Sequence, residues 1–288
     1  VYMLLARLIN SQGRTKEAET YIQKALEKDP ENFKVKHAYA DFHYTNQDLL
    51  KAQGLVDEIL GARPNYMPAR ILKGRILAKQ KKLDEALRLF QDLLKEEPDS
   101  APLNLLAGSI HFEKKAYSQA KPYLTKALEK NPNQFQARVM MADIHFRDRD
   151  IKLAEDHALK ALRLSPDHYN ANLILGNVRM AERKAEEAGA IFTKLTEQDP
   201  NNPTAFYRLG LLNRALKKEN EALKNFNTAL DLNPNLMDVF SNVIAVLAGQ
   251  KKYDAAIAKC DSHFDKVNDS PIVKAVILNL KGNLQLSS

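Results

Sequence analysis

The sequence predicts an all-α fold, a solenoid of antiparallel helix pairs in which one structural unit recurs every 34 residues. A proline keeps this interval at Pro30, Pro64, Pro98, Pro132, Pro166, Pro200 and Pro234. An alanine keeps it at Ala18, Ala52, Ala86, Ala120, Ala154, Ala188, Ala222 and Ala256. Two registers with the same period over most of the chain indicate a repeat architecture, in which each unit packs against its neighbours.

The composition agrees with a folded helical chain. Of 288 residues, 44% are hydrophobic and 27% are charged, with a formal net charge of +7, and only 10 are glycine. That balance favours helix over strand and disorder. No run approaches the roughly 18 to 20 apolar residues that cross a bilayer, and the first ten residues lack the features of a signal peptide. The sequence therefore does not distinguish a cytoplasmic from a periplasmic protein.

The periodic residues mark where helices end and where they cross. Proline lacks an N–H and disfavours helix in the residue before it, so each second helix should end near a periodic proline. Six of the seven prolines precede a residue that we expect to cap the next helix: Asn65, Asp99, Asn133, Asp167, Asn201 and Asn235. We expect the alanine at the close crossing of the two helices of a pair, where a larger side chain would push them apart.

Residues 203–236 illustrate one repeat. Phe206, Leu209 and Leu212 share one face of a first helix, and Leu223, Phe226 and Leu230 share one face of a second helix. A polar turn at 216–220 separates the two helices. One such pair is too small to bury its own apolar face, so neighbouring pairs should stack into a continuous core. The chain therefore predicts at least sixteen helices and no strand.

These patterns resemble the tetratricopeptide repeat family. The small residue that the family places in the first helix is present as Gly74, Gly108, Gly176, Gly210, Ala6, Ala40 and Ala142. The large residue of its second helix is present as Phe90, Phe192, Phe226, Ile22, Val56 and Leu124. The resemblance implies a right-handed superhelix built as a single array. Its repeats would be 1–32, 33–66, 67–100, 101–134, 135–168, 169–202, 203–236 and 237–270.

A terminal helix should follow at 271–284, with Ile272, Val276, Ile277 and Leu280 packed inward. We expect the chain to be a segment of a longer protein.

Several positions depart from the family pattern. Its early aromatic residue is replaced by Lys36, Arg70, Asn104, Arg138 and Asn172, and Ala158 and Cys260 are small for the large-residue position. These departures should weaken individual helix contacts.

No motif supports catalysis. The chain has no phosphate-binding glycine loop and no paired metal-ligand spacing, so we expect no enzyme activity, no cofactor and no metal site. Cys260, the single cysteine, should be buried and unreactive. His43, His111 and His145 share one repeat position. We expect them to pack between helices, because helices lie roughly 8–10 Å apart, too far for histidines of different repeats to share one ion.

The resemblance implies a concave groove lined by the first helices. Apolar pairs recur there, as Ile71–Leu72, Leu105–Leu106, Val139–Met140 and Leu173–Ile174. One member of each pair should be buried, whereas the other should be exposed, because adjacent helix residues diverge by about 100°. Exposed apolar stripes usually mark binding surfaces, although packing between repeats is an alternative. The candidate partner-binding residues are Arg75, Leu105, Phe112, Asp143, Phe146, Asn177, Met180, Tyr207, Arg208 and Asn242.

We therefore predict a non-enzymatic scaffold that binds a protein or peptide in this groove. The alternative is a structural spacer or self-association module within a larger bacterial assembly, linked to export, exopolysaccharide or a transferase. The basic turns alternate with acids and lack aromatic platforms, so nucleic acid is not an expected partner. The clamp by which some family members bind chaperone tails is not met, because Leu173 stands where a lysine is needed.

Overall fold

The computed structural model describes residues 2–267 and 270–287, and in them every regular element is a helix. The first helices of successive pairs are α1 (Tyr2–Ser11), α3 (Phe33–Thr45), α5 (Met67–Lys79), α7 (Ala101–Glu113), α9 (Phe135–Arg147), α11 (Tyr169–Ala181), α13 (Pro203–Ala215) and α15 (Met237–Gly249). The second helices are α2 (Thr15–Lys28), α4 (Leu49–Ala62), α6 (Leu83–Glu96), α8 (Tyr117–Lys130), α10 (Ile151–Leu164), α12 (Ala185–Gln198), α14 (Glu219–Leu232) and α16 (Tyr253–Phe264), and α17 (Pro271–Ser287) follows. Val1, where the first predicted repeat begins, lies outside the described residues, as do positions 268 and 269 of the eighth.

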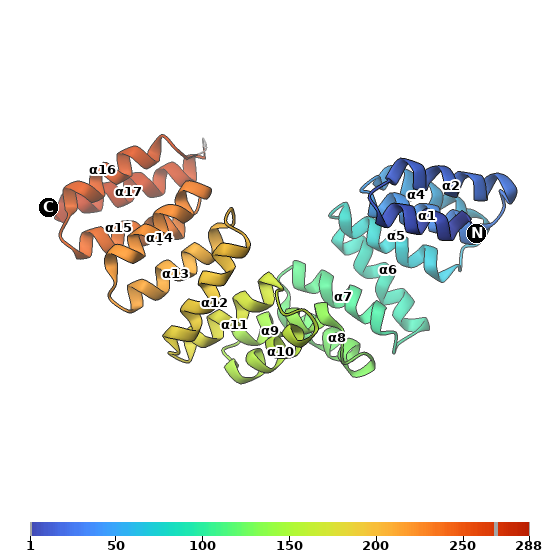
Figure 1. Cartoon of the computed structure of the whole chain (residues 1–288), viewed down its shortest axis with the longest axis horizontal. Coiled ribbons are helices and arrows are strands. Elements are labelled where there is room, and N and C mark those ends of the chain that lie inside the picture. The colour runs from blue at the N-terminus through green and yellow to red at the C-terminus, as the bar shows by residue number, and fades with distance from the viewer. Residues whose placement is uncertain (1, 268–269, 288) are drawn as a thin grey trace. The chain divides into compact units, whose positions relative to one another are not determined.

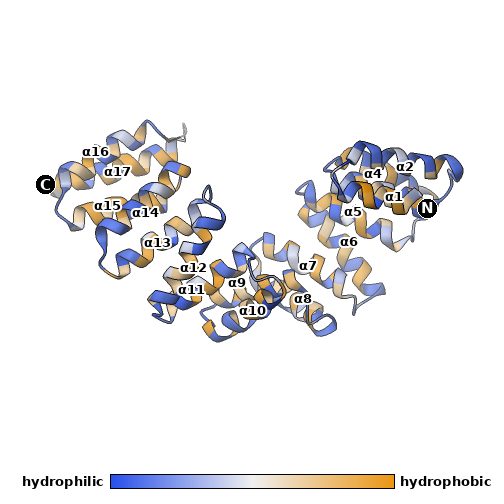
Figure 2. Ribbon diagram, viewed as in Figure 1, coloured by the Kyte–Doolittle hydropathy of each residue, from blue (hydrophilic) through white to orange (hydrophobic). Residues whose placement is uncertain are grey.

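The predicted all-helical fold is confirmed within the described residues. Each second helix from α2 to α14 ends two residues before a periodic proline, as in α14, which ends at Leu232 before Pro234. The chain divides into two compact units, Val1–Met140 and Met141–Ser288, with the boundary inside α9. Within each unit consecutive helices pack as antiparallel neighbours (Figure 1). Hydrophilic residues gather at the turns that join them (Figure 2).

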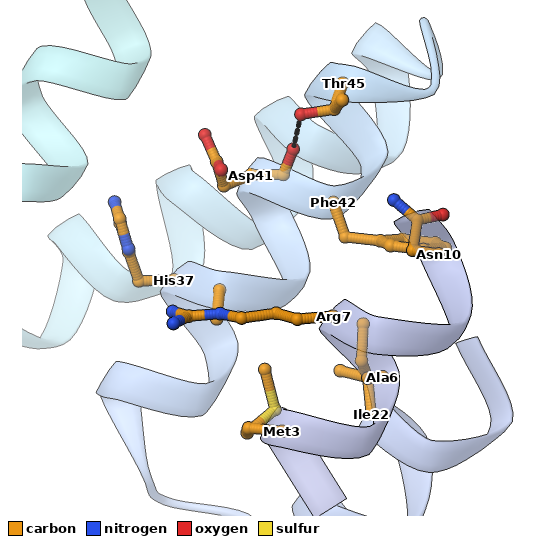
Figure 3. Close-up of a pocket in the computed structure, with 10 residues that line it drawn as sticks. Met3, Ala6, Arg7, Asn10, Ile22, His37, Asp41, Phe42 and Thr45 are labelled. Atoms are coloured by element: carbon orange, nitrogen blue, oxygen red, sulfur yellow. Dashed lines mark hydrogen bonds between the residues drawn. The ribbon is translucent and has the colours of Figure 1, made fainter. Parts of the chain in front are cut away.

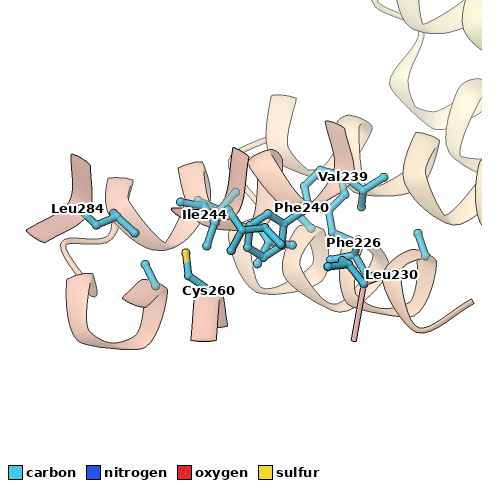
Figure 4. Close-up of a cluster of buried hydrophobic side chains, with 14 residues drawn as sticks. Phe226, Leu230, Val239, Phe240, Ile244, Cys260 and Leu284 are labelled. Atoms are coloured by element: carbon cyan, nitrogen blue, oxygen red, sulfur yellow. The ribbon is translucent and has the colours of Figure 1, made fainter. Parts of the chain in front are cut away.

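In pairs such as α11–α12 and α13–α14, the two helices cross at a contact between a small and a large residue. A Cβ atom on Gly210 would lie 2.4 Å from a ring carbon of Phe226, and Gly176 has the same relation to Phe192. Real Cβ atoms do not approach carbon so closely, so a larger residue would force the phenylalanine ring to shift. The last pair inverts the sizes, because Ile244 occupies the small position and lies near Cys260 in the same buried cluster (Figure 4).

Polar residues at the family's aromatic position make hydrogen bonds to the preceding turn. Asn104 Nδ2 donates to the Pro98 carbonyl oxygen at 3.0 Å, and Asn172 Nδ2 donates to that of Pro166 at 2.8 Å. Arg138 Nε donates to the Pro132 carbonyl oxygen at 3.0 Å. The accepting carbonyl groups lie in the turns, two residues beyond the ends of α6, α8 and α10. At these three positions a hydrogen bond between the first helix and the preceding turn therefore takes the place of an aromatic contact.

The predicted helix caps are wrong by one residue. Asn65, Asp99, Asp167, Asn201 and Asn235 each precede the residue that occupies the cap position. Asn202 is one true cap, and its side chain accepts a hydrogen bond from the Thr204 N–H at 3.0 Å. The prediction fails because the proline and the residue after it both belong to the turn, which delays the first helical residue.

The predicted inward face of the terminal helix is also partly wrong. Ile277 and Leu284 are buried in α17, but Ile272 and Val276 are exposed, Ile272 to 78%. Val273 and Leu280 are the partly buried residues that complete the inward stripe. Ile272 and Val276 each lie one residue before a member of that stripe, so helical geometry turns them about 100° away from it.

The turns within repeats hold one residue in the left-handed conformation. Gly13 has this role in the first repeat. Non-glycine residues have positive φ at the same interval thereafter, at Gln47, Lys81, Lys115, Arg149, Arg183, Lys217 and Lys251. An L-residue with a side chain adopts this conformation at a cost of about 1 kcal/mol or more. Each of these turns therefore opposes folding slightly.

Replacing Lys217 with glycine should relieve this cost. Because Lys217 has φ 58°, we expect Lys217→Gly to raise the free energy of unfolding by up to about 1 kcal/mol, measured by urea denaturation. The control is Lys224→Gly, an exposed position inside α14, which should lose about 1 kcal/mol because glycine is a poor helix former. Two losses of similar size would show that the turn is not strained.

Candidate functional site

A cavity of 550 Å³ lies within the unit Met141–Ser288, at the side chains of α9, α11 and α13. It is lined by Asp143, Phe146, Arg147, Arg149, Ile151, Asn177, Ala181 and Arg208. Four of the residues predicted from the sequence meet there: Asp143, Phe146, Asn177 and Arg208. We call the surfaces of α9, α11 and α13 that line this cavity the first-helix face.

The repeat geometry brings these residues together. Asp143 and Phe146 are three residues apart on α9, so they share one side of that helix. Asn177 occupies on α11 the repeat position that Asp143 occupies on α9, and α11 packs directly against α13, which carries Arg208. Residues at matching positions of stacked repeats therefore recur along one surface.

Asp143 already has a partner inside the cavity wall. Its Oδ2 atom lies 2.9 Å from Nε of Arg147, one turn later on α9, and its side chain is 23% exposed. Pairs at this helical spacing contribute only about 0.2–0.5 kcal/mol to stability. Their consequence here is local, because the pair neutralises the single carboxylate among the residues that line the cavity.

Arg208 differs from Asp143 because it has no hydrogen-bond or ion-pair partner among the described residues. Its Nε atom is buried without a hydrogen bond. The guanidinium group lies 5.6 Å from the centre of the Tyr207 ring, a cation–π contact. Burial lowers the pKa of Arg208, and the positive charge of Arg147 lowers it further, against an opposing effect of Tyr207. An arginine nevertheless stays charged in a protein, so the cavity holds a poorly solvated cation.

Phe146 gives the cavity its apolar side. The residue is half-buried, so its ring is neither fully packed nor free in solvent. Ile151, at the start of α10, and Ala181, at the end of α11, lie beside it in the lining. The cavity therefore combines an apolar surface with an amide from Asn177 and a guanidinium from Arg208.

The other predicted residues lie outside this cavity. In the unit Val1–Met140, Leu105 is half-buried, and the ring of Phe112 packs edge-on against Tyr117 at 5.5 Å. Arg75 Nη1 pairs with Asp41 Oδ1 at 3.2 Å. In the unit Met141–Ser288, Met180 and Tyr207 pack against buried clusters. Asn242 donates to the Asp238 carbonyl oxygen at 2.7 Å and accepts from Arg214.

The predicted division of each apolar pair into a buried and an exposed member is found only in part. Leu72 and Ile174 are buried, whereas their neighbours Ile71 and Leu173 are half-buried. The prediction is wrong for Leu105–Leu106 and Val139–Met140, because both members of each pair are half-buried. The first helices thus retain some accessible apolar surface.

Sequence reasoning missed Arg147, Arg149, Ile151 and Ala181 as members of the cavity. All four lie at or beside the ends of helices, where the repeat pattern describes a turn and says little about side-chain direction. Arg149 has a positive φ of 63°. One available signal was the position of Arg147, four residues after Asp143, since that spacing places opposite charges together on a helix.

A second, smaller cavity of 200 Å³ lies between α1 and α3 in the unit Val1–Met140. Arg7 extends from α1 into this region, with His37 and Asp41 on α3 (Figure 3). Thr45 Oγ1 donates to the Asp41 carbonyl oxygen at 2.8 Å. Arg7 is an exposed residue, so water can solvate its charge. This cavity therefore lacks the poorly solvated cation that distinguishes the larger one.

The histidines with a shared repeat position pack in the core, as predicted. His43, His111 and His145 are all buried. His111 stacks on Tyr123 with ring centres 5.4 Å apart, and His145 stacks on His157 at the same distance. Burial lowers the pKa of His43 and of His111. Across the described residues no group of three histidine, cysteine or acidic side chains is arranged to hold a metal ion.

Comparisons with known proteins agree with the repeat pattern. A tetratricopeptide repeat family matches residues 71–135, the family of anaphase-promoting complex subunit 3 matches 11–93, and the TT21 fifth ARM repeats domain matches 136–247. No curated protein matches the sequence. A chain of the APC/C hetero-tetramer Cut9–Hcn1 is similar in structure, with a TM-score of 0.67 and 17% identity. That match covers 97% of this chain but 55% of the Cut9–Hcn1 chain, so this chain spans about half the length of that relative.

Two smaller proteins are similar over most of their own length. A tetratricopeptide repeat protein from Parabacteroides merdae has a TM-score of 0.65 at 16% identity, over 87% of this chain and 99% of the other. YrrB, described as a tetratricopeptide repeat protein with an unusual peptide-binding site, has a TM-score of 0.54 at 23% identity, over 65% of this chain and 96% of its own. The period, the helix pairs and the match over residues 71–135 show that this chain contains tetratricopeptide repeats. In the described part of the chain, no helix has the length and apolar character of a membrane span.

Cys260 is buried, as predicted, and burial raises the pKa of its thiol, with a further increase from Asp261. A thiol reacts as its thiolate, so we expect the native protein to resist a disulfide reagent such as dithionitrobenzoate at pH 8. Unfolding in guanidinium chloride should release one reactive thiol per chain. Ala258→Cys, an exposed position on α16, provides a control that should react at once. Rapid reaction of the native wild type would show that Cys260 is accessible.

Proposed function

We propose that this chain is a non-enzymatic protein-binding scaffold that holds a peptide segment of its partner on the first-helix face. The observation that carries the proposal is the cavity shared by Asp143, Phe146, Asn177 and Arg208. Three successive first helices contribute to it, so an extended or helical segment lying across them would contact all three. The groove expected from the sequence would then be used at this place.

The cavity has the composition of a recognition site. Its volume of 550 Å³ falls within the range of small ligand pockets and can receive one or two side chains of a peptide. Large aromatic residues near the centre of an interface are common anchors, and Phe146 fits that role because its ring is half-buried. Asn177 and Arg208 can orient the ligand through hydrogen bonds.

Further contacts are proposed in each unit separately. In the unit Met141–Ser288, Met180, Tyr207 and Asn242 lie on the helices that line the cavity or follow them, and we propose them as outer contacts. In the unit Val1–Met140, Arg75, Leu105 and Phe112 are half-buried residues of α5 and α7 that could contact a second part of the partner. The peptide-binding site named for YrrB supports the choice of a peptide ligand, because that protein has the same type of repeat.

Self-association as a structural module is the second candidate function. It is favoured by large hydrophobic side chains that are exposed on the first and last helices. Leu4 and Leu8 of α1 are 71% and 57% exposed, and Ile272 and Leu286 of α17 are 78% and 89% exposed. Apolar surface of this kind can mediate contacts between copies. Sedimentation of the free chain, with and without Leu4→Ser and Ile272→Ser, separates this candidate from the first.

The test of peptide binding uses random dodecapeptides displayed on phage and selected against the folded chain. We expect the selected peptides to lose affinity about tenfold or more on Phe146→Ala, because truncation of an aromatic anchor costs more than about 1 kcal/mol. Affinity is measured by fluorescence anisotropy with synthetic copies of the peptides. The matched control is Leu153→Ala, which removes an exposed apolar side chain, 43% accessible, from the second helix α10.

Helical circular dichroism must be unchanged in both variants for the comparison to hold. Peptides that bind Phe146→Ala as tightly as the wild type would place the binding surface elsewhere. A chain that selects no peptide but sediments as an oligomer sensitive to Ile272→Ser would favour the structural module.

A further inference from the structure

The lining of the cavity carries a charge imbalance that limits what it can bind. We propose that the cavity binds an acidic side chain of the partner segment, and that Arg208 is the residue that pairs with its carboxylate. This inference rests on the proposed function and names the chemistry of the ligand.

Arg208 has no acidic partner among the described residues, although part of its guanidinium group is buried. The one carboxylate that lines the cavity, that of Asp143, is taken by Arg147. A cation withdrawn from water is costly unless an opposite charge or hydrogen-bond acceptors compensate it. The contact with the Tyr207 ring at 5.6 Å provides neither an opposite charge nor a hydrogen-bond acceptor of that kind. The described residues therefore supply no acceptor for this cation.

Arg179, in the same unit, provides a comparison, because it is a largely buried arginine that has acidic partners. Arg179 lies on α11, and its Nη1 atom is 2.8 Å from a carboxylate oxygen of Glu182. Its Nε atom is 2.7 Å from a carboxylate oxygen of Glu187, and Glu155 is a third acidic partner. Among the described residues, one largely buried arginine, Arg179, thus has three acidic partners, whereas Arg208 has none. That contrast indicates that the acid for Arg208 comes from outside the chain.

The lining as a whole is positive. It contains Arg147, Arg149, Arg208 and Asp143, three positive charges against one negative charge, which gives +2. Like charges repel more strongly in a partly enclosed site than in water. The repulsion is expressed in the pKa of Arg208, which Arg147 lowers. A carboxylate placed in the cavity would attract all three guanidinium groups.

The surrounding groups favour an acid with an apolar neighbour. A guanidinium group pairs with a carboxylate through two parallel N–H···O bonds. The amide of Asn177 lines the same cavity and can donate to the same carboxylate. Phe146, Ile151 and Ala181 offer apolar surface to the next side chain of the ligand. The expected motif is aspartate or glutamate within a few residues of a large apolar residue.

The experiment uses the peptides selected on the wild-type chain. Displayed peptides are joined to the phage coat through their C terminus, so a preference for acid belongs to side chains and not to a terminal carboxylate. Each peptide is synthesised with an amidated C terminus, once as selected and once with its acidic residues changed to glutamine or asparagine. We expect the wild type to bind the acidic form about tenfold or more tightly, the range of one charge-assisted hydrogen bond.

Variants assign this preference to Arg208. Arg208→Met should bind the two forms equally, and Arg208→Lys should keep part of the preference, because lysine retains the charge but not the planar pair of donors. The control Arg183→Met removes an exposed arginine of the same unit that does not line the cavity, and it should keep the full preference. The melting temperature of free Arg208→Met should rise, because the variant removes an uncompensated charge.

Equal affinity of the wild type for both peptide forms would overturn the inference, and this comparison needs no variant to fold. A preference that survives in Arg208→Met, or a melting temperature that falls in that variant, would overturn it as well. These failures differ from failure of the proposed function, in which the selected peptides bind independently of Phe146. Free acetate at the same concentration provides the check for simple anion binding, and equal competition by acetate would also contradict recognition of a peptide side chain.

Discussion

The close crossing of two helices in each repeat is the contact on which the rest of the structure depends. At Gly210 and Gly176 the missing side chain lets a phenylalanine ring of the second helix lie against the first helix. The buried alanines of the second helices, such as Ala222, are also small and let the two helices approach closely. Because each pair packs in this way, its two apolar faces remain available to its neighbours, and stacking follows. At Ile244 and Cys260 the sizes are inverted, so the crossing does not require the small residue to lie on the first helix.

Stacking also determines where functional side chains lie. Residues at matching positions of successive repeats lie on successive first helices. Asp143 and Asn177 therefore line one cavity although they are far apart in the sequence. The core supplies rigidity, and the surface of the first helices is then free to vary. Arg208 is an example, because its buried Nε atom has no hydrogen bond among the described residues and burial lowers its pKa. Such a residue is better explained by a ligand than by the fold.

The sequence predicts the fold well because its signals are repeated. Proline at a fixed interval defines helix ends, and errors at one repeat are corrected by the others. It also predicts that Cys260 and His111 are buried, since their repeat positions face the core. The turn residues are harder to predict. The cap of α13 is Asn202 and not Asn201, because helix starts depend on backbone geometry within a turn that composition alone does not specify.

The candidate site was accessible to sequence reasoning only in part. Asp143 and Arg208 are predicted because they lie on first helices, whereas Arg149 is missed because it lies in a turn. The ion pair between Asp143 and Arg147 leaves Arg208 without an acid, and this depends on side-chain directions that periodicity does not give. The charge of the cavity is thus a property of the folded unit, although every residue in it is visible in the sequence.

The central claim is that a partner segment lies against the first-helix face, and photo-crosslinking tests it most directly. p-Benzoylphenylalanine is introduced in place of Ala181, which lines the cavity, or in place of Leu153, which is exposed on α10. Each protein is irradiated with a selected peptide and the products are mapped by mass spectrometry. The account predicts a covalent product at position 181 and none at position 153. A product at 153 alone would contradict it, because the peptide would then lie on a second helix and away from the cavity.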